Sequence, residues 1–139
     1  MEGVGGISVG HGVAVGPWGG EAGDEAGLSL RESIMGNRFA HERLDCFHMA
    51  MEVAQWIRKV PFPSGDAALR DQLRRASSSV VLNIAEGASA SKGNRKKHFK
   101  IAAGSAAETA AGLTLLDLPG ADPHVEKLRS VARMLDFVR

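Results

Sequence analysis

Four apolar stripes with helical spacing constrain the fold of this chain more than any other feature of its sequence. In the first stripe, apolar residues recur at steps of three and four between Leu44 and Ile57. Such steps return to one face of an α-helix, whereas a half-buried strand alternates at every second residue. Pro61 and Pro63 follow, and proline disfavours helix at its own position and at the preceding residue. The pattern predicts an amphipathic helix that ends before Pro61.

The second stripe covers residues 69–84 and predicts a second helix. It follows Ser64-Gly65-Asp66, a run that is typical of a turn, and Asp66 is the predicted N-cap. Gly87 and the Ala-Ser-Ala-Ser run after it mark the predicted end of this helix.

The third and fourth stripes predict two more helices. The third begins near Gly93 or Asn94 and continues to about Leu116, before Pro119-Gly120. The fourth covers residues 125–138, with Asp122 as the predicted N-cap and Pro123 at the first helical position. No stretch alternates convincingly enough to indicate a strand. Short connections between four striped helices imply antiparallel neighbours, so the sequence predicts an all-α, up-down four-helix bundle over residues 39–139.

The N-terminal segment has a different composition. Eleven of the 17 glycines fall in residues 1–36, where five acidic residues accompany a single basic one, Arg31. Glycine loses the most backbone freedom on ordering, and few side chains here could offset that cost. We therefore expect a disordered, glycine-rich tail over residues 1–38. Met35 is an alternative translation start, which the intact mass of the natively expressed protein would test.

Net charge, cysteine content and hydropathy indicate in which compartment the protein works. The whole chain has a net charge of +1, but residues 40–139 contain 15 basic and 11 acidic residues, a net charge of +4. Cys46 is the only cysteine, so no intramolecular disulfide is available. No apolar run approaches the roughly 18 residues that span a bilayer. These features predict a cytoplasmic protein without membrane contact.

A polar stripe lies beside the apolar face of the second predicted helix. Its members are spaced by three or four residues, and they are Gln72, Arg75, Ser79, Asn83 and Glu86. Polar groups at the edge of a core need hydrogen-bond partners. The stripe fits a network inside the fold that fixes helix register, the same network across a subunit interface, a ligand site, or an ordinary solvated edge.

A basic segment, SKGNRKKHFK, opens the third predicted helix. It contains Lys92, Arg95, Lys96, Lys97 and Lys100, and no acidic residue lies between Glu86 and Glu108. Positions four apart share one helix face, so the segment is a candidate site for RNA or DNA phosphates. The alternative is an ordinary solvated helix start. Phe99 lies at the apolar spacing and is predicted to be in the core rather than to stack on a base.

Motifs for catalysis and metal binding are weak. Cys46 and His48 have no second pair at metal-ligand spacing, and His41-Glu42 lacks the later histidine of HExxH. Ser89 and Lys92 match SxxK without the partner motifs of that enzyme class. We therefore expect no catalytic residues, no metal site and no cofactor.

Two sequence blocks resemble the signature of the four-helix-bundle family of 23S rRNA intervening-sequence proteins. The first block is Gln72-Leu73-Arg74-Arg75-Ala76, Ser79-Val80 and Asn83-Ile84-Ala85-Glu86-Gly87, and the second is Phe99, Ile101-Ala102, Gly104-Ser105 and Glu108. The resemblance covers about residues 39–139. It implies a family motif with a role at a subunit interface for Gln72, Arg75, Ser79, Asn83, Glu86, Gly87, Gly104, Ser105 and Glu108.

The resemblance also implies a mode of assembly and a set of partners. Known relatives form a homopentameric ring, and the accessory protein of diversity-generating retroelements is related to them. That protein binds a reverse transcriptase and nucleic acid through a basic surface. Two functions follow as expectations: a non-catalytic oligomeric adaptor that binds RNA or DNA, with a reverse transcriptase or another protein as partner, or a structural oligomer and protein-interaction module without a nucleic-acid role.

Overall fold

The computed structural model describes residues 36–138. A short 3-10 helix, η1 (Ala40–Arg43), precedes four α-helices, which are α2 (Asp45–Lys59), α3 (Ala67–Ser89), α4 (Lys92–Leu116) and α5 (Asp122–Val138). The described residues contain no strand. All four predicted helices are therefore confirmed. The predicted tail lies outside the described residues except for its last three positions, and so does the alternative start at Met35.

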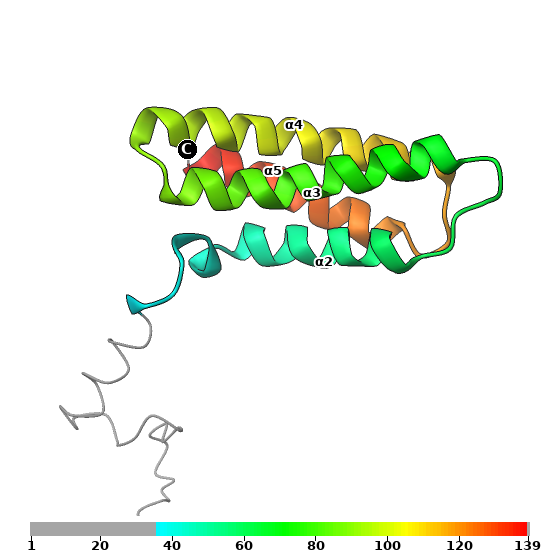
Figure 1. Cartoon of the computed structure of the whole chain (residues 1–139), viewed down its shortest axis with the longest axis horizontal. Coiled ribbons are helices and arrows are strands. Elements are labelled where there is room, and N and C mark those ends of the chain that lie inside the picture. Colours follow the sequence, from blue (N-terminus) through cyan, green and yellow to red (C-terminus); the bar gives the residue numbers. More distant parts are fainter. Residues whose placement is uncertain (1–35, 139) are drawn as a thin grey trace, which may run out of the picture. The chain divides into compact units, whose positions relative to one another are not determined.

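The four α-helices form an up-down bundle. Figure 1 shows that successive helices run in opposite directions, with the α2–α3 and α3–α4 connections at opposite ends. Each helix packs against the next one along the chain, and α5 returns to pack against α2, while η1 contacts α2 and α3. The short connections that the sequence predicts are therefore sufficient to place α2 to α5 around one core.

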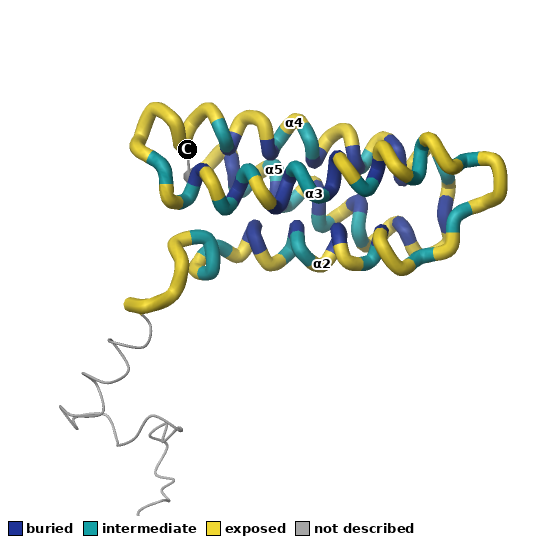
Figure 2. Tube along the Cα trace, in the orientation of Figure 1, coloured by how far each residue is buried: buried dark blue, intermediate teal, exposed yellow. Residues whose placement is uncertain are grey.

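The core consists of the apolar stripes that the sequence predicts. Buried positions lie on the inner sides of the helices in Figure 2. The largest fully buried side chains include Ile57, Leu73, Ile84, Phe99, Leu113, Leu128 and Leu135. Cys46 is also buried, and burial raises the pKa of its thiol, which keeps it protonated as a small core side chain. None of the helices in the described part is long and apolar enough to cross a membrane.

The predicted helix ends are confirmed for α3 and wrong by one residue at the start of α5. Asp66 is the N-cap residue of α3, as predicted, although its side chain makes no capping hydrogen bond. Asp122 is the first residue of α5 rather than its cap. α3 ends at Ser89, inside the predicted Ala-Ser-Ala-Ser run, so Gly87 lies within the last turn of the helix. Gly87 is also a site of close packing against Phe99.

Two glycines allow α3 and α4 to approach each other closely. A Cβ atom at Gly87 would lie 2.6 Å from Cε1 of Phe99, and a Cβ atom at Gly112 would lie 2.5 Å from Cδ2 of Leu73. Both distances are far below van der Waals contact. Gly87 on α3 and Gly112 on α4 therefore each accommodate a core side chain of the opposite helix, which fixes the separation and the register of the pair.

His124 joins α5 to α2 and makes stability depend on pH. Its ring stacks on Trp56 with 4.2 Å between the centroids, and its Nδ1 atom is buried with no hydrogen-bond partner among the described residues. Burial lowers the pKa of His124, with a contribution from Lys127 that Glu52 opposes. The unfolded chain therefore binds more protons than the folded chain just below the ordinary pKa of histidine.

We expect the His124 contribution to reduce the free energy of unfolding as the pH falls through about 6.5. Chemical denaturation of the wild type and His124→Phe between pH 5 and pH 8 measures it. The phenyl ring preserves the stack on Trp56 but cannot titrate. The difference in stability between the two proteins should therefore favour the variant increasingly at low pH, and a pH-independent difference would contradict the assignment.

Candidate nucleic-acid interface

The first turns of α4 carry a dense group of positive charges, which we call the α4 basic cluster. It contains the residues predicted from the sequence, which are Lys92, Arg95, Lys96, Lys97 and Lys100, and all five are exposed. The helix begins at Lys92, slightly earlier than predicted, and its first turn contains no acidic residue. Within the described part of the chain, no member of the cluster makes an ion pair.

Three of the five cations surround a single open hollow. Its lining consists of Lys96, Lys97 and Lys100 together with Gly93 and Ile101. Lys92 and Arg95 belong to the same turns but do not line it. The N-terminus of a helix carries a partial positive charge, which adds to the field of the lysines. Clustered cations of this kind are the chemistry by which proteins contact phosphate groups without reading a base sequence.

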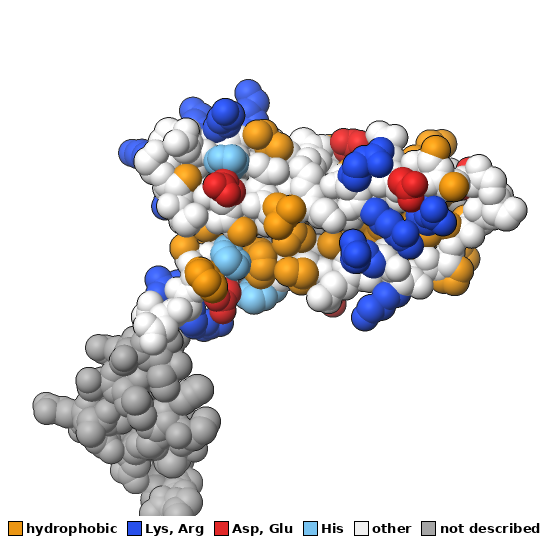
Figure 3. Space-filling view, in the orientation of Figure 1, with side chains coloured by type: hydrophobic (Ala, Val, Ile, Leu, Met, Phe, Trp, Pro, Cys, Tyr) orange, Lys and Arg blue, Asp and Glu red, His pale blue; other side chains and the backbone are white. Residues whose placement is uncertain are grey.

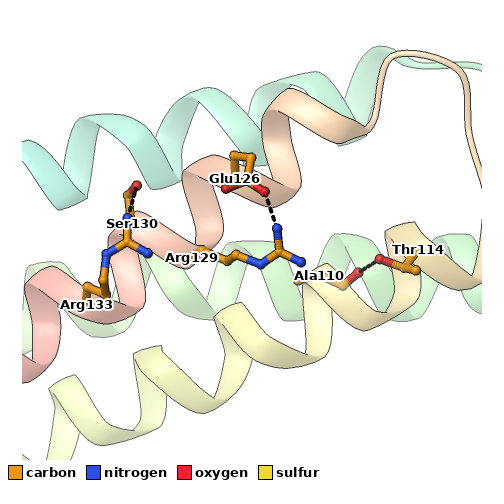
Figure 4. A network of polar contacts seen from close by, with 6 residues as sticks. All are labelled: Ala110, Thr114, Glu126, Arg129, Ser130 and Arg133. Carbon is orange, nitrogen blue, oxygen red and sulfur yellow. Dashed lines mark hydrogen bonds and ion pairs between the residues drawn. The ribbon is translucent and has the colours of Figure 1, made fainter.

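The arginines of α5 have different surroundings. Figure 4 shows Arg129 paired with Glu126 and the Arg133 guanidinium donating to the Ser130 hydroxyl, in addition to a bond in α4 from Thr114 to a backbone carbonyl. The Arg133 contact measures 3.0 Å between Nη2 and Oγ. These α5 cations have partners on their own helix, so they provide a matched control for the unpaired lysines of α4.

The polar stripe of α3 lies against α4, and we call the resulting row of contacts the α3–α4 seam. Gln72 Nε2 donates to Glu108 Oε2 over 2.9 Å, and the hydroxyl oxygens of Ser79 and Ser105 are 2.8 Å apart. His98 Nδ1 donates to Asn83 Oδ1 over 2.9 Å. Three members of the stripe therefore have partners on the neighbouring helix of the same chain.

Further bonds along each helix extend the seam. Asn83 Nδ2 donates to the Ser79 carbonyl over 2.9 Å and to the Ser79 hydroxyl over 3.1 Å. The fully buried Thr109 donates to the Ser105 carbonyl over 2.7 Å. The Asn83 side-chain amide therefore bonds through both of its polar atoms. Its oxygen accepts from His98, and its nitrogen donates to Ser79. A network of this kind fixes the register of α3 against α4.

The other residues of the predicted interface differ in their exposure to solvent. Arg75 and Glu86 are exposed, and neither side chain has a hydrogen-bond or ion-pair partner among the described residues. Gly104 is also exposed, and a Cβ atom there would meet open space. Gly87 is buried against Phe99. The motif therefore combines a seam inside the chain with three outward positions.

Sequence reasoning missed His98 as a member of the seam. The basic neighbours of His98 suggested a solvated segment, yet its ring is half-buried and bonded to Asn83. No sequence signal marks His98 as a partner of Asn83, because their contact depends on the close packing of Phe99 on Gly87, one helical turn after Asn83. Phe99 itself is only 2% exposed, which confirms its predicted place in the core.

Asn83→Ala is expected to lower the free energy of unfolding by about 1–2 kcal/mol, because His98 and Ser79 lose a shared partner in a half-buried place. Glu86→Ala, one turn later on the exposed side of the same helix, is the control and should change stability by less than about 0.5 kcal/mol. Urea denaturation of both variants measures the difference. Equal effects would show that the seam does not stabilise the fold.

Residues elsewhere offer little for metal chemistry. Searched over the described residues, the chain has no group of three or more His, Cys, Asp or Glu side chains that could hold a metal ion. Cys46 is buried, whereas His48 is exposed and its Nε2 lies 2.9 Å from the Glu42 carbonyl oxygen. Cys46 and His48 therefore do not form the beginning of a metal site.

Comparison with known proteins gives one family match. The family model described as 23S rRNA-intervening sequence protein matches residues 42–120, which is more than half of the chain. The match contains α2, α3 and α4, and therefore both helices of the seam and the whole α4 basic cluster. A search of curated proteins found no match.

Proposed function

Because this chain belongs to the 23S rRNA-intervening sequence protein family, we propose that it is a non-catalytic adaptor that holds RNA or DNA through the α4 basic cluster. The observation that carries the proposal is the set of exposed cations without ion-pair partners around one hollow. When a lysine neutralises a phosphate, the nucleic acid releases counterions condensed on it, so affinity should fall steeply with salt.

The non-catalytic part of the proposal rests on the α3–α4 seam. Its polar side chains bond one another along the two helices, including those of Gln72, Ser79, Ser105 and Glu108, which line an open surface hollow. The seam therefore has the chemistry of a structural network that fixes helix register. We place the protein in the cytoplasm, where nucleic acid is accessible to it.

We further propose that the protein works as a homo-oligomer, a pentamer by its resemblance to ring-forming relatives. Large apolar side chains support an assembly: Leu82 is 66% exposed and Leu115 is 75% exposed. Leu82 borders an apolar hollow between α2 and α3, and Leu115 borders another between α3 and α4. An assembly would repeat the α4 basic cluster in each subunit and strengthen its field.

A structural oligomer or protein-interaction module is the second candidate function, and the same exposed leucines favour it. A reverse transcriptase or another protein could be the partner in either case. Leu82→Lys and Leu115→Lys separate the assembly from nucleic-acid binding, because neither residue belongs to the α4 basic cluster. Light scattering should report a smaller assembly for at least one variant, and an unchanged mass for both would rule out these leucines as the interface.

Native mass spectrometry of the full chain, alone and with bulk cellular RNA, tests the proposed function. We expect an oligomer that carries RNA at low ionic strength and loses it as salt is raised. An oligomer without RNA at every salt concentration would favour the structural alternative. A monomer that binds RNA would remove the assembly from the proposal.

A further inference from the structure

We propose that the pocket at the α2–α3 turn binds a phosphate group. The pocket has a volume of about 300 Å³, and it is lined by residues 60–65 together with Ala67, Arg70 and Arg74. The α2–α3 connection lies at the opposite end of the bundle from the α3–α4 connection, where α4 begins (Figure 1). The site is therefore separate from the α4 basic cluster and does not rest on the function proposed for it.

Arg74 provides the observation that points to a ligand. Its Nε atom is buried and has no hydrogen-bond partner among the described residues. Its Nη2 atom makes only a long contact, 3.5 Å, with the Arg58 carbonyl oxygen. Buried guanidinium N–H groups need acceptors, and a guanidinium offers five donors and no acceptor. A group that pairs with the Arg74 guanidinium must supply acceptor atoms, as the oxygens of an anion do.

Arg70 reinforces the preference for an anion. It lies four residues before Arg74, so the two side chains leave the same face of α3, and both line the pocket. Its Nε donates to Asp71 Oδ1 over 3.2 Å, and its terminal Nη atoms make no hydrogen bond within the described residues. Two arginines with available terminal nitrogens match the several oxygens of one phosphate group.

The turn itself contributes donors and little competing charge. The Ser64 hydroxyl has no partner among the described residues and faces no carboxylate in the pocket lining. The Asp66 side chain does not cap α3, so it leaves the first N–H groups of the helix without a side-chain acceptor. Between residues 58 and 75 the chain has five basic and two acidic residues. In Figure 3, Lys and Arg side chains gather over this half of the molecule.

The test is titration of inorganic phosphate into isotope-labelled full-length protein at constant ionic strength, followed by NMR. We expect saturable shifts at the Ser64 and Gly65 amides and at the Nε groups of Arg70 and Arg74. Arg70→Gln should weaken phosphate binding about tenfold or more, and Arg129→Gln should leave it unchanged. Because Arg74→Gln removes a half-buried side chain and could disturb the fold, the decisive comparison uses Arg70.

Shifts that chloride reproduces, or that Arg70→Gln leaves unchanged, would overturn the proposal. A second arm identifies the source of the phosphate and uses a short single-stranded RNA with wild type, Arg70→Gln and Lys96→Gln. An RNA affinity that falls in Arg70→Gln assigns the phosphate to a nucleic-acid backbone, and an unaffected RNA affinity assigns it to free phosphate. Loss of RNA binding in Lys96→Gln but not in Arg70→Gln would assign RNA binding to the α4 basic cluster. The phosphate bound in this pocket would then be free phosphate.

Discussion

Lys96→Gln/Lys100→Gln is expected to lower the affinity for single-stranded RNA about 25-fold at about 0.1 M salt, with no change in fold. Both lysines are exposed, line one hollow, and have no ion-pair partner in the described part of the chain. Each phosphate contact on a single strand contributes a salt slope of about −0.7, and two such contacts are worth about 1.4 decades at that salt concentration. Fluorescence anisotropy with a labelled oligonucleotide measures the change.

The matched control is Arg129→Gln/Arg133→Gln on α5, which removes the same formal charge. Those arginines contact Glu126 and Ser130 on their own helix (Figure 4). A general effect of net charge would weaken RNA binding equally in both double variants. An effect of the α4 basic cluster would appear only in the lysine variant, and equal losses would therefore contradict a localised interface.

Phe99→Ala is expected to lower the free energy of unfolding by about 3–5 kcal/mol, the usual cost of removing a fully buried phenyl ring. Phe99 is 2% exposed and contacts Gly87 across the α3–α4 pair. The same contact predicts that Gly87→Ala costs about 1–3 kcal/mol, because the new Cβ atom would overlap the ring. Gly104→Ala is the control, and it should stabilise the protein by up to about 1 kcal/mol, because its Cβ atom meets open space on a helix.

A double-mutant cycle separates the overlap of the new Cβ atom at position 87 with the Phe99 ring from the other effects of Gly87→Ala. In the Phe99→Ala background, Gly87→Ala no longer meets the ring and should be neutral or slightly stabilising. Denaturant unfolding of the two single variants and the double variant gives the coupling energy. Additive effects would show that Gly87 is required for a reason other than its contact with Phe99.

The fold was predictable from the sequence because it depends mainly on local periodicity. The stripes of residues 44–57 and 69–84 determine which faces of α2 and α3 are buried, and Pro61 and Pro63 separate the two helices. Phe99 was also predictable, since its apolar spacing places it on the inner face of α4. Steps of three and four residues carry this information without any knowledge of the neighbouring helix.

The partners across the seam were not predictable in the same way. Asn83 and His98 are 15 residues apart and belong to different helices, and their 2.9 Å contact depends on the register of α3 against α4. That register follows from close contacts such as Phe99 with Gly87, which no periodicity reveals. For the same reason the sequence does not show that Gly87 packs against Phe99. The polar stripe itself is visible in the sequence, but which of its members bond across α3 and α4 depends on the opposite helix.

The candidate nucleic-acid interface was found from charge alone, and the structure adds its geometry. The sequence gives five cations in ten residues, whereas the hollow gathers only Lys96, Lys97 and Lys100. The arginines at the α2–α3 turn do not stand out as a group in the sequence, because Asp66 and Asp71 lie among them. Their shared pocket and the buried Nε of Arg74 distinguish them from an ordinary charged surface.

The salt dependence of RNA binding by the wild-type protein is the most direct test of the proposed function. If the three lysines of the hollow each contact a phosphate, a plot of log affinity against log salt should have a slope of about −2 or steeper. Lys96→Gln/Lys100→Gln should make that slope shallower by about 1.4. An absence of binding at about 50 mM salt, or a slope near zero, would contradict a nucleic-acid role for the α4 basic cluster.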